Sequence, residues 1–129
     1  MAGSAAELSG LGLPPALARQ MGSLLLNSIT AATTQTQAAG TSLTGTINVI
    51  TVCANSSDAV TLPSLASLNY PMVIVSNQGA QTTQIFPASG QSVNGGTTDA
   101  SVTLAAGKVG IFWGKTFKAA GDWVFMAGA

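Results

Sequence analysis

Apolar stretches of strand length alternate with turn residues from about residue 46 to the C-terminal end of the chain. In one of them, Val102 and Leu104 alternate with small or polar residues, so that both larger side chains share one face of a strand. Each break contains Gly, Asn, Pro or Ser, the residues that interrupt strands. The pattern predicts strands over residues 46–53, 59–62, 72–76, 82–86, 91–93, 101–105, 109–113 and 123–126.

The breaks between these strands have defined turn chemistry. Asn94-Gly95 favours a turn with positive φ angles, and Ser89-Gly90 and Gln78-Gly79 mark further reversals. Pro63 and Pro87 each end a strand, because proline lacks the backbone donor that a sheet needs. The spacing predicts an all-β fold, an antiparallel β-sandwich or jelly-roll-like domain of about eight short strands or a small barrel, rather than a parallel α/β fold.

A helical pattern precedes the predicted strands. Apolar side chains recur at spacings of four, four, three and one, which places them in one stripe of an α-helix. These stripe residues are Leu13, Leu17, Met21, Leu24 and Leu25. Pro14 and Pro15 suit the start of a helix, whereas Gly22 weakens its interior. So short a helix is marginal alone, and we expect it to dock on its own β domain, on symmetry mates or on a larger partner.

Residues 30–45 are rich in Thr, Ala and Gln and contain almost no large apolar side chain. Such a segment cannot build a core and is typical of an extended linker or arm. Its many threonines favour extended backbone, which could add to the edge of a neighbouring sheet. We therefore divide the chain into an N-terminal helix and arm for attachment or oligomerisation, residues 1–45, and a β-sandwich domain, residues 46–129.

Charged residues make up only 6% of the 129 residues, whereas a soluble domain typically carries about 25%. A surface so poor in charge favours coverage by identical subunits or by a larger assembly, the alternative being an ordinary domain made polar by Thr, Ser, Gln and Asn. The formal net charge of zero gives no electrostatic footprint for nucleic acid or an anionic membrane.

No stretch approaches the roughly 18 apolar residues of a membrane span. The N-terminus lacks signal-peptide features, so we expect synthesis in a cytosol.

The chain contains no histidine, which removes the common nucleophilic triads and most zinc and iron sites. Cys53 is the only cysteine and lies in an apolar strand, where a buried, inert thiol is expected. Three carboxylates near predicted strand ends, Asp58, Asp99 and Asp122, could form a glycosidase pair, but solvated turn residues are the better interpretation. Residues 94–99 offer only a poor calcium-loop pattern. We predict no enzyme activity, no cofactor and no metal.

Two tryptophans lie near the predicted C-terminal strands. Trp113 or Trp123 on an exposed loop could stack on a sugar ring, as aromatic side chains of adhesins do. The favoured interpretation is that both pack in the core of the last strands, where aromatic side chains bury large areas. Glycan binding therefore stays an alternative that the sequence leaves open.

Five motifs follow one another from residue 60 onward: V-x-L-P, V-x-x-x-N-x-G, I-x-P-x-S-G-x-x-x-N-G-G, V-x-L-x-x-G-K and a closing W-x-x. They occupy Val60–Pro63, Val73–Gly79, Ile85–Gly96, Val102–Lys108 and Trp123. Upstream, L-P-x-x-L-A at Leu13–Ala18 precedes an Ile-Thr-Ala stretch at Ile29–Ala31. In this order the motifs resemble a module of tailed-bacteriophage virion proteins, found in capsid decoration (cement) proteins, head fibres and tail-fibre attachment segments.

The resemblance implies a viral structural protein, a homotrimer whose N-terminal arm attaches it to the particle. The absence of a long shaft or large tip favours a capsid decoration protein that binds the major capsid protein on the outer capsid surface and stabilises the phage head. Attachment and oligomer contacts are expected at Leu13, Leu17, Met21, Leu24 and Leu25. The alternative is a short head or tail fibre, or an adhesin module that recognises host surface glycans. In either case the protein belongs to the virion and is assembled in the host cytoplasm.

Overall fold

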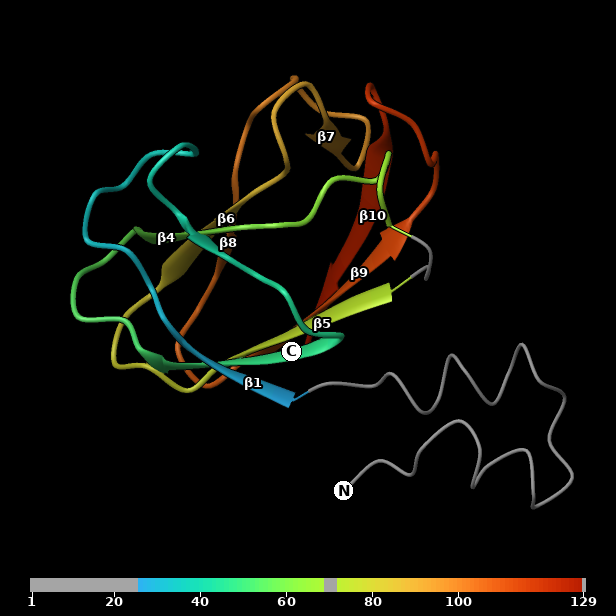
Figure 1. Cartoon of the computed structure of the whole chain (residues 1–129). Coiled ribbons are helices and arrows are strands. Elements are labelled where there is room, and N and C mark those ends of the chain that lie inside the picture. The colour runs from blue at the N-terminus through green and yellow to red at the C-terminus, as the bar shows by residue number, and fades with distance from the viewer. Residues whose placement is uncertain (1–25, 69–71, 129) are drawn as a thin grey trace, which may run out of the picture.

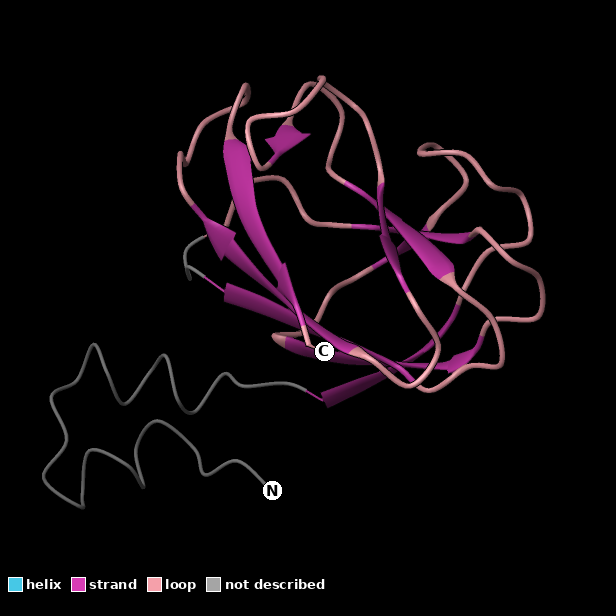
Figure 2. Cartoon of the chain, turned by 180° about the vertical axis from the view of Figure 1, so that it is seen from behind, coloured by secondary structure: helices cyan, strands magenta, loops and turns pink. Residues whose placement is uncertain are grey.

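The protein is all-β over the part of the chain that the computed structural model describes, residues 26–68 and 72–128 (Figures 1 and 2). The strands are β1 (Leu26–Thr30), β2 (Thr41–Ser42), β3 (Ile47–Val52), β4 (Asp58–Thr61), β5 (Met72–Asn77), β6 (Thr83–Phe86), β7 (Ser92–Val93), β8 (Val102–Leu104), β9 (Val109–Gly114) and β10 (Asp122–Ala127). The predicted N-terminal helix and all five stripe residues lie outside the described residues.

These strands form two mixed sheets. The larger sheet has six strands in the order β1-β3-β5-β9-β10-β7, and the smaller has four in the order β2-β4-β6-β8. In Figure 1, β4, β6 and β8 lie together on one side of the molecule, apart from β5, β9 and β10. The chain changes sheet after every strand from β1 to β8, and only β9 and β10 follow one another within one sheet.

This alternation winds the first part of the chain into stacked coils. β1, β3 and β5 pair in parallel in the larger sheet, and β2, β4 and β6 pair in parallel in the smaller one. Each pass through both sheets therefore stacks on the previous pass, as in a short parallel β-helix. Antiparallel pairs then attach β9 to β5, β10 to β9 and β8 to β6.

The prediction of an antiparallel arrangement is wrong, because parallel pairs outnumber antiparallel ones among the described strands. In an antiparallel sandwich, many turns close hairpins in which consecutive strands pair with one another. Instead, most turns carry the chain across to the other sheet. Alternation along a strand shows which face is buried, but it does not identify the neighbouring strand.

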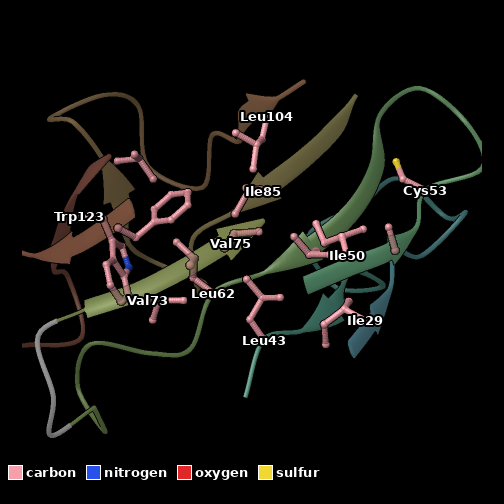
Figure 3. Close-up of a cluster of buried hydrophobic side chains, with 14 of the residues drawn as sticks. Ile29, Leu43, Ile50, Cys53, Leu62, Val73, Val75, Ile85, Leu104 and Trp123 are labelled. Carbon is pink, nitrogen blue, oxygen red and sulfur yellow. The ribbon is translucent and has the colours of Figure 1, made fainter. Parts of the chain in front are cut away.

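The two sheets share one hydrophobic core (Figure 3). The larger sheet contributes Ile50, Val73, Val75, Phe112 and Trp123, and the smaller contributes Val60, Ile85 and Leu104, each at most 1% exposed. Trp123 and Cys53 lie toward opposite ends of this cluster. Phe112 meets Trp123 edge to face at 6.3 Å and stacks on Phe125 at 4.5 Å. Gly110 makes room for that stack, because a Cβ there would lie 2.7 Å from Cε1 of Phe125.

Two described strands were not predicted. β1 and β2 fall in the stretch assigned to the helix and arm, and each adds in parallel to an edge of the sheets. Residues 30–45 also contribute to the core, since Ala31 and Leu43 are buried. The prediction that this stretch cannot contribute to a core is therefore wrong, because two apolar side chains among many polar ones are enough to reach it. A role of residues 1–45 in attachment stays a prediction.

Candidate functional site

An apolar surface covers the side of the six-stranded sheet that faces away from the core. Its positions alternate with the buried residues of β3, β5, β9 and β10. We call this surface the outer face; it consists of Ile47, Val49, Met72, Ile74, Val109, Ile111, Trp113, Val124 and Met126. Large apolar side chains therefore occupy both sides of these four strands, a pattern typical of a sheet that is covered on both faces.

Strand register aligns the outer face into rows. Ile47 lies opposite Ile74, Ile74 opposite Ile111, and Ile111 opposite Met126. A second row joins Met72, Trp113 and Val124. Because side chains at directly opposed positions contact one another, these rows form one continuous apolar surface rather than scattered exposed residues.

Three outer-face side chains are strongly exposed in the described chain. Val109 is 44% exposed, Trp113 47% and Met126 60%. Single exposed apolar residues are common on protein surfaces, but large contiguous apolar patches typically mark interaction sites. The outer face is therefore a contiguous apolar surface of the kind that typically marks an interaction site.

The two tryptophans have opposite environments. Trp123 is fully buried, which confirms core packing for that residue and makes it the wrong candidate for sugar stacking. Trp113 lies in the outer face and is half exposed, so the expectation that it packs in the core is wrong. Residue parity explains the difference, because Trp113 pairs with Val124 on the outer side while its neighbour Phe112 points inward with Phe125.

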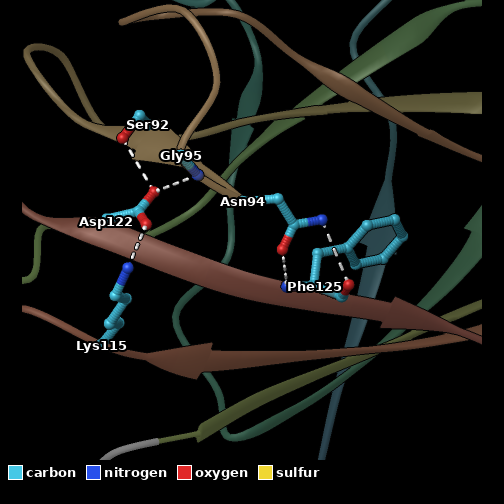
Figure 4. Close-up of polar contacts among 6 residues, drawn as sticks. All are labelled: Ser92, Asn94, Gly95, Lys115, Asp122 and Phe125. Carbon is cyan, nitrogen blue, oxygen red and sulfur yellow. Dashed lines mark hydrogen bonds and ion pairs between the residues drawn. The ribbon is translucent and has the colours of Figure 1, made fainter.

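Polar contacts cluster around Asp122 at the start of β10 (Figure 4). Asp122 Oδ1 accepts hydrogen bonds from Ser92 Oγ at 2.8 Å and from the Gly95 amide at 3.0 Å, and Oδ2 lies 3.7 Å from Lys115 Nζ. Beside it, Asn94 Oδ1 accepts a bond from the Phe125 amide and its Nδ2 donates to the Phe125 carbonyl. This cluster attaches the β7 turn to β10.

The other two predicted carboxylates also stabilise loops. Asp58 Oδ2 accepts bonds from the amides of Ala54 and Asn55, at 3.1 and 3.0 Å. Asp99 Oδ1 accepts from Gln37 Nε2 at 3.0 Å and from the Gly90 amide at 2.8 Å. Each carboxylate is thus a hydrogen-bond acceptor for its own surroundings. Asp99 is an exposed turn residue, as predicted, but Asp58 is fully buried at the start of β4, so the interpretation as a solvated turn residue is wrong for Asp58.

These contacts lower the pKa of all three carboxyls. The Asn55 amide is the main cause at Asp58 and the Gln37 side chain at Asp99. At Asp122, burial alone would raise the pKa, but the bonds from Gly95 and Ser92 and the charge of Lys115 together outweigh it. The carboxylates therefore favour folding in their charged form.

Between about pH 2 and pH 8, we expect stability to depend on pH only in the acid part of the range. The folded-state pKa of each carboxyl lies below the unfolded value of about 3.9, so the unfolded chain binds more protons as the pH falls. Their stabilisation is complete above that value and is lost on further acidification. Without histidine, the urea midpoint should stay level from about pH 5 to 8. A midpoint that changed between pH 5 and 8, or stayed constant to pH 2, would contradict this assignment.

The two remaining candidate sites, the thiol of Cys53 and the loop over residues 94–99, make contacts that stabilise the fold. Cys53 is buried, and desolvation, then the charge of Asp58, raises the pKa of its thiol. In the poor calcium-loop pattern, Asn94 is bonded to Phe125, and Asn94 and Gly95 have φ angles of 53° and 66°, as their turn was predicted to have. Within residues 26–68 and 72–128, no cluster of three or more acidic, Cys or His side chains could hold a metal ion.

The outer face was not among the predicted site residues. The signal for it was present in the apolar residues on both sides of the strand over residues 46–53, and again over 72–76 and 109–113. Such strands need cover on both faces, yet the sequence does not show that their outer sides join into one surface. The predicted stripe residues lie outside the described chain, so their role stays a prediction.

No protein-family model, curated protein or solved structure matches this chain. The described residues also contain no helix with the length and hydropathy to cross a membrane.

Proposed function

We propose that this protein is a viral structural protein of the capsid decoration type, a homotrimer that binds the major capsid protein on the outer surface of a tailed-phage head. Two sheets with a common core suit a β-sandwich whose role is mechanical. The motif order from Val60 to Trp123 supports the phage assignment, and the low charge content supports burial in an assembly. In this function the protein adds contact area between capsid subunits and so resists internal pressure.

The observation that carries an assembly function is the outer face. It presents rows of apolar side chains across β3, β5, β9 and β10, and its most exposed members are Val109, Trp113 and Met126. Such a surface provides the apolar core of a protein–protein interface. Stable interfaces bury about 1,200–2,000 Å² in total, and threefold repetition on a particle adds avidity.

A charge on the outer face should weaken assembly. We expect Val109→Asp to reduce trimer formation and capsid binding at least about tenfold, because an unpaired carboxylate buried in an apolar interface costs well over 1.4 kcal/mol. Sedimentation equilibrium and a capsid pull-down measure the two effects. Thr103→Asp is the matched control, since Thr103 is an exposed strand position on β8 of the smaller sheet. Equal behaviour of both variants would refute the outer face as the assembly surface.

Copy number tests the place on the particle. A decoration protein is present in hundreds of copies per virion, whereas a tail or fibre protein is present in a handful. Quantitative mass spectrometry of purified virions distinguishes them, and absence from the virion would refute both assignments.

The second candidate function is host glycan recognition by a short fibre or adhesin. One observation favours it, the half-exposed indole of Trp113, which offers the kind of flat aromatic surface on which sugars stack. This role would require Trp113→Ala to abolish polysaccharide binding without loss of folding.

A further inference from the structure

The outer face needs cover before any assembly forms. Its rows are apolar over four neighbouring strands, and the chain has little charge elsewhere to keep an uncovered monomer in solution. Exposed contiguous apolar surface promotes aggregation. In the free chain, this cover has to come from a segment of the same molecule or from a second copy of it.

The N-terminal segment of the chain is connected to the edge strand of the sheet that bears the outer face. β1 is the edge strand of the six-stranded sheet, and Leu26 pairs with Ile47 in the same row as Ile74 and Ile111. Since β1 runs parallel to β3 and β5, the residues before Leu26 arrive from the end of the sheet at which β5 begins. Met72 lies at that end, opposite Trp113. The preceding 25 residues are therefore connected at the same end of the sheet as the exposed indole, on the edge strand three strand spacings from β9, roughly 14 Å away.

The sequence of these residues matches the face in chemistry and length. As a helix, residues 13–25 would be about 20 Å long, and β3 and β10 lie three strand spacings apart, roughly 14 Å. Arg19 is the only charged residue between positions 8 and 25. It is two residues from both Leu17 and Met21, roughly 200° around a helix. A helix with its stripe on the sheet would thus keep Arg19 in water.

We propose that in the free chain residues 13–25 form an amphipathic helix whose stripe packs on the outer face of the same molecule. Attachment at the edge of the face keeps the helix at an effective concentration in the millimolar range, which favours its own chain over a second copy. The helix and the outer face then cover one another until a partner replaces them. This consequence for assembly rests on the proposed function, whereas the intramolecular contact does not.

Fluorescence quenching tests the contact, because the chain has two tryptophans and Trp123 is fully buried. Acrylamide quenching of the full-length monomer therefore reports on Trp113. We expect protection of Trp113 in the wild-type chain and loss of that protection in the double variant L17D/M21D. Arg19→Asp is the matched control and should keep the wild-type protection, because it lies on the other side of the helix.

Two results would overturn the proposal. One is equal quenching of the wild-type chain and L17D/M21D. The other is protection that disappears when dilution converts oligomers into monomers, which would show that a second copy covers the face. Nuclear magnetic resonance tests the same contact without variants. Nuclear Overhauser contacts between the Trp113 ring and methyl groups of residues 13–25 are expected in the monomer. Their absence would refute the contact.

The outcomes separate this inference from the proposed function. Protection of Trp113 in the monomer without trimers or capsid binding would support the intramolecular helix and refute the decoration role. Trimers that bind capsids, combined with an unprotected Trp113 in the monomer, would refute only the helix contact.

Discussion

Trp123→Ala should destabilise the fold by about 3–5 kcal/mol, the usual cost of removing a large aromatic side chain from a core. Trp123 is fully buried in β10 and meets Phe112 edge to face. Domains of this kind are stable by only about 5–15 kcal/mol, so the variant loses a large part of its folding free energy. Urea unfolding followed by circular dichroism measures the loss without depending on indole fluorescence.

Two other substitutions serve as controls for the loss of stability in Trp123→Ala. Trp123→Phe should cost clearly less, because Trp123 Nε1 has no hydrogen-bond partner in the described structure and a second aromatic ring keeps much of the packing. Trp113→Ala should stay within about 0.5 kcal/mol in stability, as surface substitutions usually do. If Trp113→Ala and Trp123→Ala were equally damaging, the assignment of inner and outer faces to β9 and β10 would be wrong.

Asn77→Ala should cost about 3 kcal/mol or more, because each buried polar group left without a partner costs about 1–3 kcal/mol. Asn77 is fully buried at the end of β5. Its Nδ2 donates to the carbonyls of Gln81 at 2.8 Å and Leu104 at 2.9 Å, and its Oδ1 accepts from the Gly79 amide at 3.0 Å. Since β5 and β8 belong to different sheets, this one side chain connects both.

Asn27→Ala is the matched control for Asn77. The Asn27 amide donates to Thr44 Oγ1 at an exposed position, so its removal should change stability by less than about 0.5 kcal/mol. The urea midpoints of both variants, measured at pH 7, give the comparison. A loss at Asn77 no greater than that at Asn27 would contradict a structural role for the buried amide.

The sequence was sufficient to place most strands but not to pair them. All eight predicted strands occur within one or two residues of their expected ends, from Ile47–Val52 to Asp122–Ala127. Their alternation and the flanking Gly, Asn and Pro residues are local signals. β1 was missed because it directly follows the leucines assigned to a helix, and β2 because its stretch contains few large apolar residues. Both strands pair with strands that are distant in the sequence, β3 and β4.

Local signals in the sequence also indicated part of the candidate site. Apolar residues on both sides of three strands indicated cover on both faces, but only the register places Trp113 between Met72 and Val124. Trp113 and Trp123 are similar in sequence context, since both lie in apolar strands. Odd and even positions of a strand face opposite sides of the sheet. The sequence does not show which of the two sides will pack against the second sheet.

By itself, the sequence determined the β class, the positions of most strands, the turn at Asn94-Gly95 and the lack of histidine chemistry, because each depends on residue type and local spacing. Only the tertiary structure decided that successive strands alternate between two sheets and stack in parallel. It also decided that the outer side chains of β3, β5, β9 and β10 form one apolar face. Both depend on contacts between residues far apart in the chain, where burial of both sheets in a shared core selects one pairing among many that local propensity allows.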